Sequence, residues 1–452
     1  MCTTVLSVNG EIVRTHQFNN LNLKKTSISK NLNNLLTYNL ILLVSVAVLC
    51  FACSAQEPTL NENVNQEAAD LIESIIEESV RAEPNETEQQ GNDSDETSLT
   101  EVKRPASAIY RPELVDISGY INVDDLVLDD LEGKVILIDF WTYTCINCIR
   151  TFPYLNDWHE KYAADGLVIV GVHTPEFEFE KILSNVEIAA QEFGLEYPIV
   201  LDNDRATWRN YQNQYWPAKY LIDREGYVRY SHFGEGEYEE TETVIRDLLQ
   251  EGGNVISESG NTFLAQRPYV EIPEDQTELE SQTRELYAGT IRNYNAMFIA
   301  RRPPYVAHEQ FYTQRDIDME YTDPAIHRNH YIYLNGLWLN KRESLKHSRD
   351  TNEYEDYVAI LFYGTSANVV LTGFGETDPY TVMVYLDDMP IKNEFAGEDI
   401  KWDSSGNSYI EVIDSRLYRL IKSPDYGGFE LKISSNSEKF ELFAFTFGSF
   451  QN

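Results

Sequence analysis

The sequence predicts an α/β domain with a mixed central sheet and helices on both faces, followed by an all-β sandwich domain. Three observations lead to this prediction. Between residues 106 and 252, buried-strand runs alternate with helical patterns, which is typical of a sheet covered by helices. From residue 291 to 452, short runs rich in Tyr, Val, Ile and Phe recur between clusters of turn residues, as in a β-sandwich. Residues 253–290 are polar and irregular, and predict a linker between the two domains.

Each element of the first pattern follows from its apolar spacing and its ends. Residues 134–141 form a buried-strand run that begins after Gly133, and residues 145–163 follow as a helix that contains Pro153. Strands then alternate with helices until an antiparallel hairpin and a last helix close the domain, which makes the sheet mixed. These later elements are predicted at residues 167–174, 180–195, 197–202, 206–215, 218–234 and 241–253.

The second pattern consists of short runs in which β-branched and aromatic residues alternate with polar ones. Such alternation predicts strands with one buried face. The strands are predicted at residues 330–339, 357–364, 368–375, 380–388, 409–414, 429–434 and 440–448. Aromatic residues in this region either fill the core or form a platform for sugar rings, so a glycan or an envelope protein is a candidate partner. The most prominent are Trp338, Tyr363, Tyr385 and Trp402.

The composition is that of a globular protein with a strong acidic excess. The chain has 452 residues, of which 42% are hydrophobic, and its net charge is −38 from 74 acidic and 36 basic residues. A chain of this length can bury more than one full core. Like charges repel, so the sequence argues against nucleic acid and anionic lipid surfaces as direct partners.

Residues 1–53 are typical of a bacterial export segment. The apolar run at residues 40–52 has about 13 apolar residues, too few for a membrane span of ~20 but enough for a signal peptide. Cys53 lies among small residues and resembles the modified cysteine of a lipoprotein, which makes it a lipidation candidate. The departure from that motif is Cys50, where Leu is preferred. Cleavage after Ala55 and retention as a short anchor are the alternatives.

Residues 54–105 are rich in Glu, Asn, Asp, Gln and Ser, with few aromatic residues. This composition predicts an acidic, disordered tether. With any of the three outcomes for the export segment, the folded part lies outside the cytoplasm, in the periplasm or on the outer face of a bacterial membrane.

The cysteines of the predicted folded part are a single pair. Five cysteines occur in the chain, and of these only Cys145 and Cys148 lie beyond the export segment. The pair is therefore either redox-active or half of a metal site, since no disulfide framework is available. A zinc site needs two further ligands, and no cysteine follows residue 148, so no metal site is predicted. Copper delivery by the pair remains an alternative.

The position of the pair after a buried strand suggests its chemistry. A cysteine at the first turn of a helix faces free N–H groups and the positive end of the helix dipole, which favour a thiolate. We therefore expect a lowered pKa at Cys145, which would be the nucleophile. Cys148, one turn deeper, would attack the mixed disulfide and release the reduced partner.

The run 139–148, DFWTYTCINC, resembles the strand and active-site segment of the thioredoxin superfamily, and the match covers residues 106–252. The resemblance implies that Asp139, six residues before Cys145, is the buried acid that handles the proton of the resolving thiol. It also implies that Trp141 lies beside the disulfide, where it contributes to substrate binding. No cofactor besides the cysteine pair is implied.

Further substrate-binding residues follow from the same resemblance. Trp216 and Pro217 match the cis-proline loop, whose backbone pairs with a bound substrate strand, so a cis bond is expected between them. His173 ends a predicted strand near the active-site edge of the sheet and is a candidate for substrate contact, with a loop-stabilising hydrogen bond as the alternative. The acidic residues after it are expected to form a solvated loop face: Glu176, Glu178 and Glu180.

The strand and helix inserted before the proline resemble the membrane-anchored reductases of the TlpA and ResA type. Over residues 106–452 the chain is most similar to the soluble part of DipZ-type proteins, a family of cytochrome c biogenesis and disulfide reduction. In that family a sandwich of the carbohydrate-binding-module type follows the thioredoxin domain. The resemblance does not extend to the family's membrane electron-transfer domain, so a separate CcdA- or DsbD-like membrane protein is expected to donate electrons.

The sequence therefore predicts an extracytoplasmic thiol–disulfide oxidoreductase. We expect it to reduce disulfides of protein substrates, in cytochrome c maturation or in envelope redox homeostasis. One alternative is an envelope binding module in which the sandwich docks a glycan or a protein and the redox domain is accessory. The other is a copper or metal chaperone that uses the cysteine pair.

Overall fold

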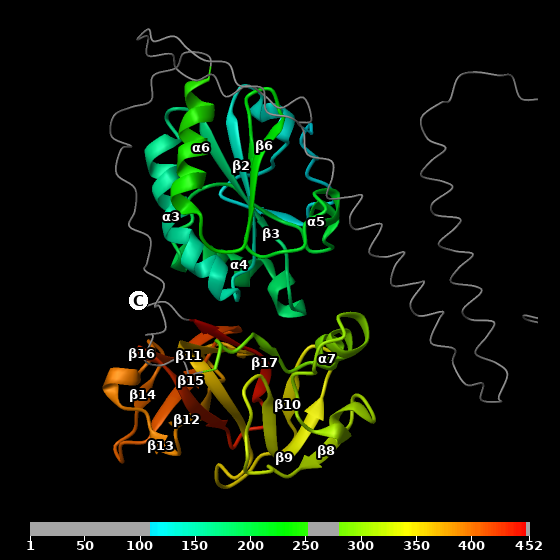
Figure 1. Ribbon diagram of the computed structural model, residues 1–452, viewed down its shortest axis with the longest axis vertical. Coiled ribbons are helices and arrows are strands. Elements are labelled where there is room, and N and C mark those ends of the chain that lie inside the picture. Colours follow the sequence, from blue (N-terminus) through cyan, green and yellow to red (C-terminus); the bar gives the residue numbers. More distant parts are fainter. Residues whose placement is uncertain (1–108, 252–279, 449–452) are drawn as a thin grey trace, which may run out of the picture. The chain divides into compact units, whose positions relative to one another are not determined.

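The computed structural model describes residues 109–251 and 280–448, which belong to one compact unit, Ser98–Asn452. Residues 109–251 form an α/β domain, and residues 280–448 form a β-rich domain, here called the β domain (Figure 1). The predicted export segment, the lipidation candidate Cys53 and the predicted tether lie outside the described residues. None of the helices described is long and apolar enough to cross a membrane.

The α/β domain is built on a mixed sheet, as predicted, and the sheet has six strands, one more than the sequence analysis placed. In spatial order the strands are β1 (Gly119–Ile121), β4 (Ile199–Leu201), β3 (Leu167–His173), β2 (Val135–Trp141), β5 (Ala218–Ile222) and β6 (Val228–Phe233). Strands β2, β3 and β4 run parallel, whereas β5, β6 and β1 pair antiparallel with their neighbours. Every residue of β2 is buried, as expected for a central strand with both faces covered.

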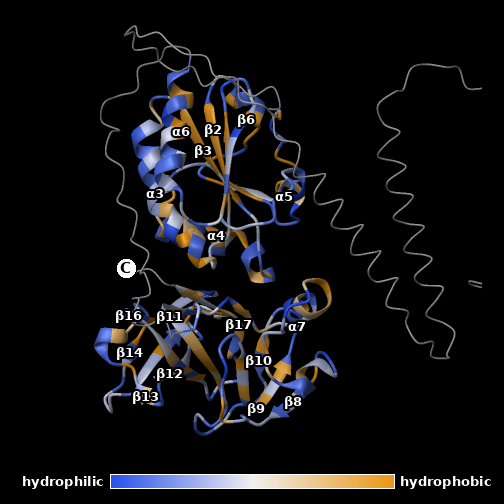
Figure 2. Ribbon diagram, viewed as in Figure 1, coloured by the Kyte–Doolittle hydropathy of each residue, from blue (hydrophilic) through white to orange (hydrophobic). Residues whose placement is uncertain are grey.

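Helices cover both faces of this sheet because side chains alternate along its strands. The helices are α3 (Ile146–Tyr162), α4 (Leu183–Glu192), α5 (Ala206–Asn210) and α6 (Tyr238–Gln250), with 3-10 helices η2 (Leu128–Leu131) and η3 (Glu178–Lys181). Val135 and Leu137 of β2 share one apolar cluster with α3, α4 and α6, while Ile136 and Ile138 share another with α5 and η2. Figure 2 shows the apolar character of β2 and β3 between helices with mixed surfaces.

Two helices differ from the prediction. The helix predicted at residues 206–215 ends at Asn210, because Gln212 adopts a φ of 51° and the Asn213 side chain accepts the backbone N–H groups of the next two residues. The helix predicted at 180–195 is divided into η3 and α4 at Ile182, whose backbone is extended. Both interruptions direct the chain into loops at the carboxyl ends of the parallel strands.

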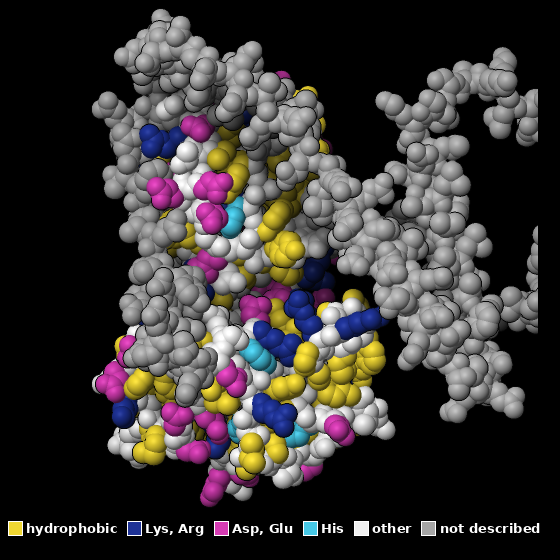
Figure 3. All heavy atoms as spheres, viewed as in Figure 1, with side chains coloured by type: hydrophobic (Ala, Val, Ile, Leu, Met, Phe, Trp, Pro, Cys, Tyr) yellow, Lys and Arg dark blue, Asp and Glu magenta, His cyan; other side chains and the backbone are white. Residues whose placement is uncertain are grey.

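The β domain holds the remaining strands in one connected hydrogen-bonded network. They are β7 (Leu286–Tyr287), β8 (Asp318–Tyr321), β9 (Ile332–Asn340), β10 (Leu345–His347), β11 (Tyr357–Leu371), β12 (Tyr380–Leu386), β13 (Met389–Pro390), β14 (Lys401–Trp402), β15 (Ser408–Val412), β16 (Arg416–Ser434) and β17 (Glu441–Gly448). Short helices lie between some of them: α7 (Thr290–Tyr294), the π-helix η6 (Asn295–Ile299), η7 (Glu309–Tyr312) and η8 (Asn393–Phe395). Acidic and basic side chains are interspersed on the face of this domain drawn in Figure 3.

The long strand β11 corrects one prediction. Residues 357–364 and 368–375 were expected to be separate strands, but Tyr357–Leu371 is continuous, with register shifts near Gly364 and Ala367. Its first half pairs with β9 and its second half with β17, while β16 pairs along most of its length. Bulges increase the local bend and twist of a strand. The bend lets one strand serve both halves of the sheet without a turn.

The β domain also begins earlier than predicted. β7 lies within the predicted linker 253–290, yet Leu286 and Tyr287 pair with Phe445 and Ala444 of β17. Leu286 is fully buried, which explains why this short segment is ordered by the domain rather than left as a linker. Trp338 is also fully buried, and its indole N–H donates to the carbonyl oxygen of Asn335, so it fills the core rather than forming a sugar platform.

Candidate active site

Cys145 and Cys148 lie at the start of α3, directly after the end of β2. Cys145 is the N-cap residue of α3, and its Sγ accepts the backbone N–H of Cys148 at 3.3 Å. Both are free thiols; Cys145 is 9% exposed and Cys148 is fully buried. The N-cap position follows from the sequence, because β2 must end before the helix can begin and the thiol replaces the usual capping oxygen. Cys145 is therefore the cysteine of the pair that a partner can reach.

The pKa values of the two thiols differ from the sequence-based expectation. Burial raises the pKa of Cys145, although its hydrogen bond with Cys148 lowers it, and the nearby carboxylate of Glu285 raises it further. Burial raises the pKa of Cys148 well above its usual value, and its hydrogen bond to Cys145 adds to this. The helix N-terminus does not outweigh desolvation in the described arrangement. Cys145 still ionises more easily than Cys148, in line with an attacking and a resolving thiol.

Asp139 lies in the middle of β2 and is 1% exposed. It is the direct antiparallel partner of Lys219 on β5, so their side chains leave the same face with Cβ atoms about 5 Å apart. Burial raises the pKa of Asp139 to about 7, and the positive charge of Lys219 lowers it. A carboxyl with a pKa near neutrality can both accept and return a proton.

Lys219 is the functional candidate that the sequence analysis missed. Its side chain is fully buried, and neither its Nζ nor the carboxylate of Asp139 has a hydrogen-bond partner in the part of the chain described. Burial lowers the pKa of Lys219, whereas Asp139 and Cys148 raise it. Its Nζ also lies 5.5 Å from the ring centre of Tyr238. The signal in the sequence was a lysine inside an otherwise apolar strand run, two residues after Pro217.

Trp141 and His173 lie beneath the cysteines rather than at the surface. Both are fully buried, and their rings meet edge to face at 4.8 Å. Gly171 permits this, since a Cβ there would lie 2.9 Å from the indole nitrogen of Trp141. Burial lowers the pKa of His173 to about 3, so its imidazole is neutral. The predicted substrate contact is not available to either side chain in this arrangement; His173 instead lies 3.4 Å from the hydroxyl of Thr142.

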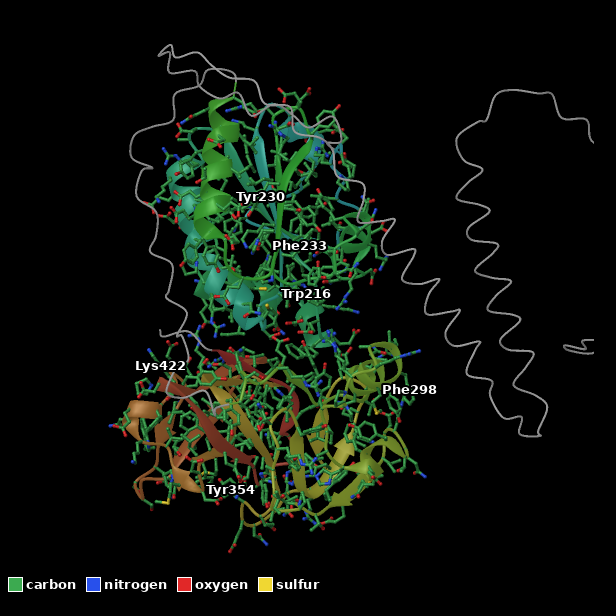
Figure 4. All side chains as sticks on the ribbon, viewed as in Figure 1. Trp216, Tyr230, Phe233, Phe298, Tyr354 and Lys422 are labelled. Atoms are coloured by element: carbon green, nitrogen blue, oxygen red, sulfur yellow. The ribbon has the colours of Figure 1, made fainter. Side chains whose placement is uncertain are left out.

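Trp216 and Pro217 precede β5, and the peptide bond between them is cis, as expected. The indole N–H of Trp216 donates to the carbonyl oxygen of Thr174 at 3.0 Å, which fixes the loop at the carboxyl end of β3. The Trp208 ring packs at a tilt against Trp216, with ring centres 4.3 Å apart, and the guanidinium of Arg205 lies 4.9 Å from the Trp216 ring. Figure 4 labels Trp216, which remains partly exposed. Trp216 is therefore placed where a substrate strand can reach it.

The acidic loop after β3 is a solvated face only in part, because Glu178 is exposed, as expected from the sequence, whereas Glu180 is not. Glu180 is fully buried and accepts the hydroxyl of Thr144 at 2.5 Å. Its other oxygen accepts the backbone N–H groups of Glu176 and Phe177. Burial raises the pKa of Glu180 to about 7, although these hydrogen bonds oppose the shift. Glu180 therefore ties the loop to the residue directly before Cys145.

The β domain contacts the α/β domain beside the cysteine pair. Ile146, between the two cysteines, shares an apolar cluster with Phe177 and with Phe443 of β17. The Phe443 ring lies 5.1 Å from Phe177 and 4.9 Å from Phe179, edge to face in both cases. Apolar burial of this kind stabilises the contact. The β domain is thus part of the surroundings of Cys145.

The described residues were compared with the ligand sets that hold metal ions. Within residues 109–251 and 280–448, no three His, Cys, Asp or Glu side chains are placed to hold a metal ion together. The His159 ring, on α3, lies edge to face with Tyr197 at 5.9 Å.

Two known families match separate segments of the chain. Residues 117–231 match the AhpC/TSA family, and residues 297–448 match the family described as thioredoxin like C-terminal domain. Protein DipZ of Mycobacterium bovis is 43% identical over 195 residues, which are 40% of this chain and 26% of DipZ. The chain thus spans only 26% of the length of the DipZ relatives it matches.

A smaller relative decides the family. Thiol-disulfide oxidoreductase YkuV of Bacillus subtilis is 30% identical over 141 residues, which cover 31% of this chain and 94% of YkuV. The chain belongs to the thiol–disulfide oxidoreductase family. Thiol-disulfide oxidoreductase ResA of Bacillus thuringiensis is 27% identical, with 27% of this chain and 67% of ResA covered. The thioredoxin-like resemblance recognised in residues 139–148 is confirmed, and this oxidoreductase joins that domain to a β-rich one.

Proposed function

We propose that the protein is an extracytoplasmic protein-disulfide reductase that cycles Cys145 and Cys148 between dithiol and disulfide. The observation that supports this most is the layered position of the pair. Cys145 caps α3 at the edge of the domain, Cys148 is buried one turn below, and the buried Asp139 and Lys219 lie on the strands beneath. An accessible attacking thiol above a buried resolving thiol and a proton acceptor is what thiol–disulfide exchange requires.

The proposed reaction balances without a further cofactor. The Cys145 thiolate attacks one sulfur of the substrate disulfide, forms a mixed disulfide, and the other substrate sulfur leaves as a thiolate that takes up a proton. Cys148 then gives its proton to Asp139 and attacks Cys145. The Cys145–Cys148 disulfide forms and the second substrate thiol is released. The two electrons gained by the substrate come from the dithiol.

Trp216 and Pro217 are proposed to present the substrate. Trp216 is partly exposed beside Cys145, and both border the same small cavity. An extended segment with a disulfide would lie along this loop, where its backbone can pair with that of the chain. Trp141 and His173, buried below, would hold the floor of the site in place.

The direction of electron flow and the location are also part of the proposal. The apolar N-terminal run predicts export, and the match to DipZ supports a reducing role outside the cytoplasm, including cytochrome c maturation or envelope redox homeostasis. A reductase outside the cytoplasm must itself be reduced. We propose a separate CcdA- or DsbD-like membrane donor that reduces the Cys145–Cys148 disulfide.

Reduction of insulin disulfides by the reduced protein tests the proposal. Cys145→Ser should lower turnover to the uncatalysed rate, because the other described thiol, Cys148, is fully buried and cannot reach the substrate. Cys148→Ser should instead accumulate a mixed disulfide through Cys145, which mass spectrometry identifies. Retained turnover in Cys145→Ser would exclude Cys145 as the nucleophile, and a reduction potential near about −120 mV would indicate an oxidant instead of a reductant.

A further inference from the structure

A small cavity adjoins Cys145, and the two domains build it together. Its volume is about 60 Å³. The α/β domain contributes Cys145, Glu176 and Trp216 to its wall, and the β domain contributes Glu285 and Tyr287. Cys145 is only 9% exposed and borders this space, so a reagent that reaches the thiol through it meets side chains of both domains. Residues of the β domain are therefore part of the route to the thiol.

The two carboxylates of this cavity differ in how their charge is balanced. Glu176 forms an ion pair with Arg292 of α7. The carboxylate of Glu285 instead accepts a hydrogen bond from the Tyr287 hydroxyl at 2.8 Å, a neutral partner. Two cations act on Glu285, Arg292 and then Arg150 of α3, but Arg292 forms its ion pair with Glu176 and Arg150 contacts Glu235 at 3.4 Å.

The balance of charge leaves Glu285 as a local negative charge at neutral pH. Burial raises the pKa of Glu285, but only to about 6, so the carboxylate is still largely ionised at pH 7 and above. Its charge also acts on the thiol. Burial raises the pKa of Cys145 most, the hydrogen bond with Cys148 lowers it, and the negative charge of Glu285 raises it again. A charge in a partly desolvated site acts more strongly than one in water.

We propose that Glu285 is a specificity-determining residue, placed by the β domain so that Cys145 reacts with neutral or cationic disulfides in preference to anionic ones. The inference rests on the proposed function of Cys145 as the attacking thiol. It names the substrate class as disulfides flanked by neutral or basic groups, and it places anionic disulfides such as that of glutathione among the poor substrates. In this role the β domain supplies the charge that decides which disulfides react at Cys145.

Alkylation of Cys145 by two reagents of similar size and different charge tests this directly. Iodoacetamide is neutral and iodoacetate is anionic; with each, the Cys145 thiolate forms a carbon–sulfur bond and iodide leaves. The full chain is reduced and reacted with each reagent at pH 8, and peptide mass spectrometry gives the rate at Cys145. The ratio of the two rates cancels the thiolate fraction, so it measures the charge selectivity alone.

Three variants make the test specific. Glu285→Gln removes the charge and retains the shape, and we expect the iodoacetate rate relative to iodoacetamide to rise about fivefold. Glu285→Asp retains the charge and should keep the ratio close to that of the natural chain. Glu178→Gln is the matched control, because Glu178 is exposed, pairs with Lys181 and does not border the cavity. Its ratio should not change.

The outcomes separate this inference from the proposed function. An unchanged ratio in Glu285→Gln, an equal rise in Glu178→Gln, or no reaction of Cys145 with either reagent would overturn the selectivity role. None of these measurements requires disulfide turnover. If Cys145 alkylates with the expected ratios but insulin is not reduced, the proposed function fails while the selectivity of the site stands.

Discussion

Asp139 of the α/β domain and Asp356 of the β domain are buried to the same extent but differ in their partners. Each is 1% exposed. The carboxylate of Asp356 accepts two hydrogen bonds from Arg349, at 2.7 and 2.6 Å, and one from His347 at 2.9 Å. The carboxylate of Asp139 has no hydrogen-bond partner among the described residues, and Lys219 is its neighbour across the sheet.

The pKa values of the two carboxyls shift in opposite directions for this reason. Burial raises the pKa of Asp356, but the hydrogen bonds from Arg349 and His347 outweigh it and hold the pKa below the usual range. Burial dominates at Asp139 and raises its pKa to about 7. A buried charge that is fully hydrogen-bonded stabilises a fold, whereas one left without partners costs stability and persists where it serves chemistry. The comparison therefore separates a structural site from a candidate catalytic one.

The largest expected effect is on stability, at Asp356. Asp356→Ala leaves the buried His347 and the Arg349 guanidinium without their acceptor, so we expect the free energy of unfolding of the β domain to fall by roughly 3–5 kcal/mol. Urea denaturation measures it. Glu320→Ala is the control, because Glu320 is an exposed partner of Arg349 at 3.7 Å and should cost less than about 0.5 kcal/mol. A similar loss in both variants would contradict the structural role of Asp356.

The second effect is on the rate, at Asp139. Asp139→Asn retains the shape of the side chain but cannot accept the Cys148 proton, so we expect resolution of the mixed disulfide to slow about 100-fold. In the natural chain this step should accelerate as the pH rises through about 7, because the carboxyl must be ionised to act as a base. Single-turnover release of reduced substrate measures the step across pH.

The same substitution sharpens the comparison with Asp356, because the effect on stability should have the opposite sign. Above pH 7 the natural chain holds a buried charge that Asn lacks, and Lys219, whose pKa burial lowers, can lose its proton once the opposing charge is removed. We therefore expect Asp139→Asn to unfold at an equal or higher urea concentration. A pH profile of the variant that still rises through 7 would show that another group takes the proton.

The two aspartates also show which features of the site could be predicted from the sequence and which could not. Asp139 was predicted as a buried acid because it lies six residues before Cys145 in a motif that is local in the chain. Lys219 was not predicted, because its pairing with Asp139 depends on the register between β2 and β5, strands 80 residues apart in this pairing. Lysine in a strand is ordinarily expected at the surface, and the apolar run around Lys219 indicates burial but not its partner across the sheet.

Other features were missed for related reasons. Glu180 looked like one of three solvated glutamates at alternate positions, but the 3-10 helix η3 turns it inward toward Thr144. The contact between Phe443 and the loop at Phe177 joins the two domains, and no pattern in the sequence predicts it. Periodicity identifies which residues are buried within an element, but long-range pairing decides which of them meet.

The third prediction concerns Glu180. Its folded-state pKa of about 7 lies above the usual 4.5. The contribution of Glu180 to the free energy of unfolding is therefore greatest below pH 4.5 and is lost as the pH rises through 7. Glu180→Gln keeps the size and can still bond Thr144 and the loop, but it has no charge to bury. Urea denaturation gives the free energy of unfolding of both chains. We expect the value for the variant, relative to that of the natural chain, to increase by roughly 1–3 kcal/mol between about pH 5 and pH 8. A constant difference across pH would mean that Glu180 does not titrate in this range.

The smallest expected effect is at Lys219, and it tests the comparison most closely. The charge of Lys219 lowers the pKa of Asp139, so Lys219→Met should raise that pKa further and move the rise of the resolution rate about one unit to higher pH. At pH 7 this corresponds to a loss of up to about tenfold in rate. Single-turnover kinetics across pH measure the shift, and Lys134→Met, an exposed lysine next to β2, should leave the profile unchanged.

A double substitution isolates the pair. If Lys219 acts through Asp139, then Lys219→Met should have no effect on the pH profile in the Asp139→Asn background, since no carboxyl remains to shift. An equal shift in that background would mean that Lys219 acts on Cys148 directly, which its charge also reaches. In either case the buried pair differs from the Asp356 cluster in one respect. Among the described residues its two charged groups have no hydrogen-bond partner, and burial raises the pKa of Asp139 to about 7, where the carboxyl can both accept and return a proton.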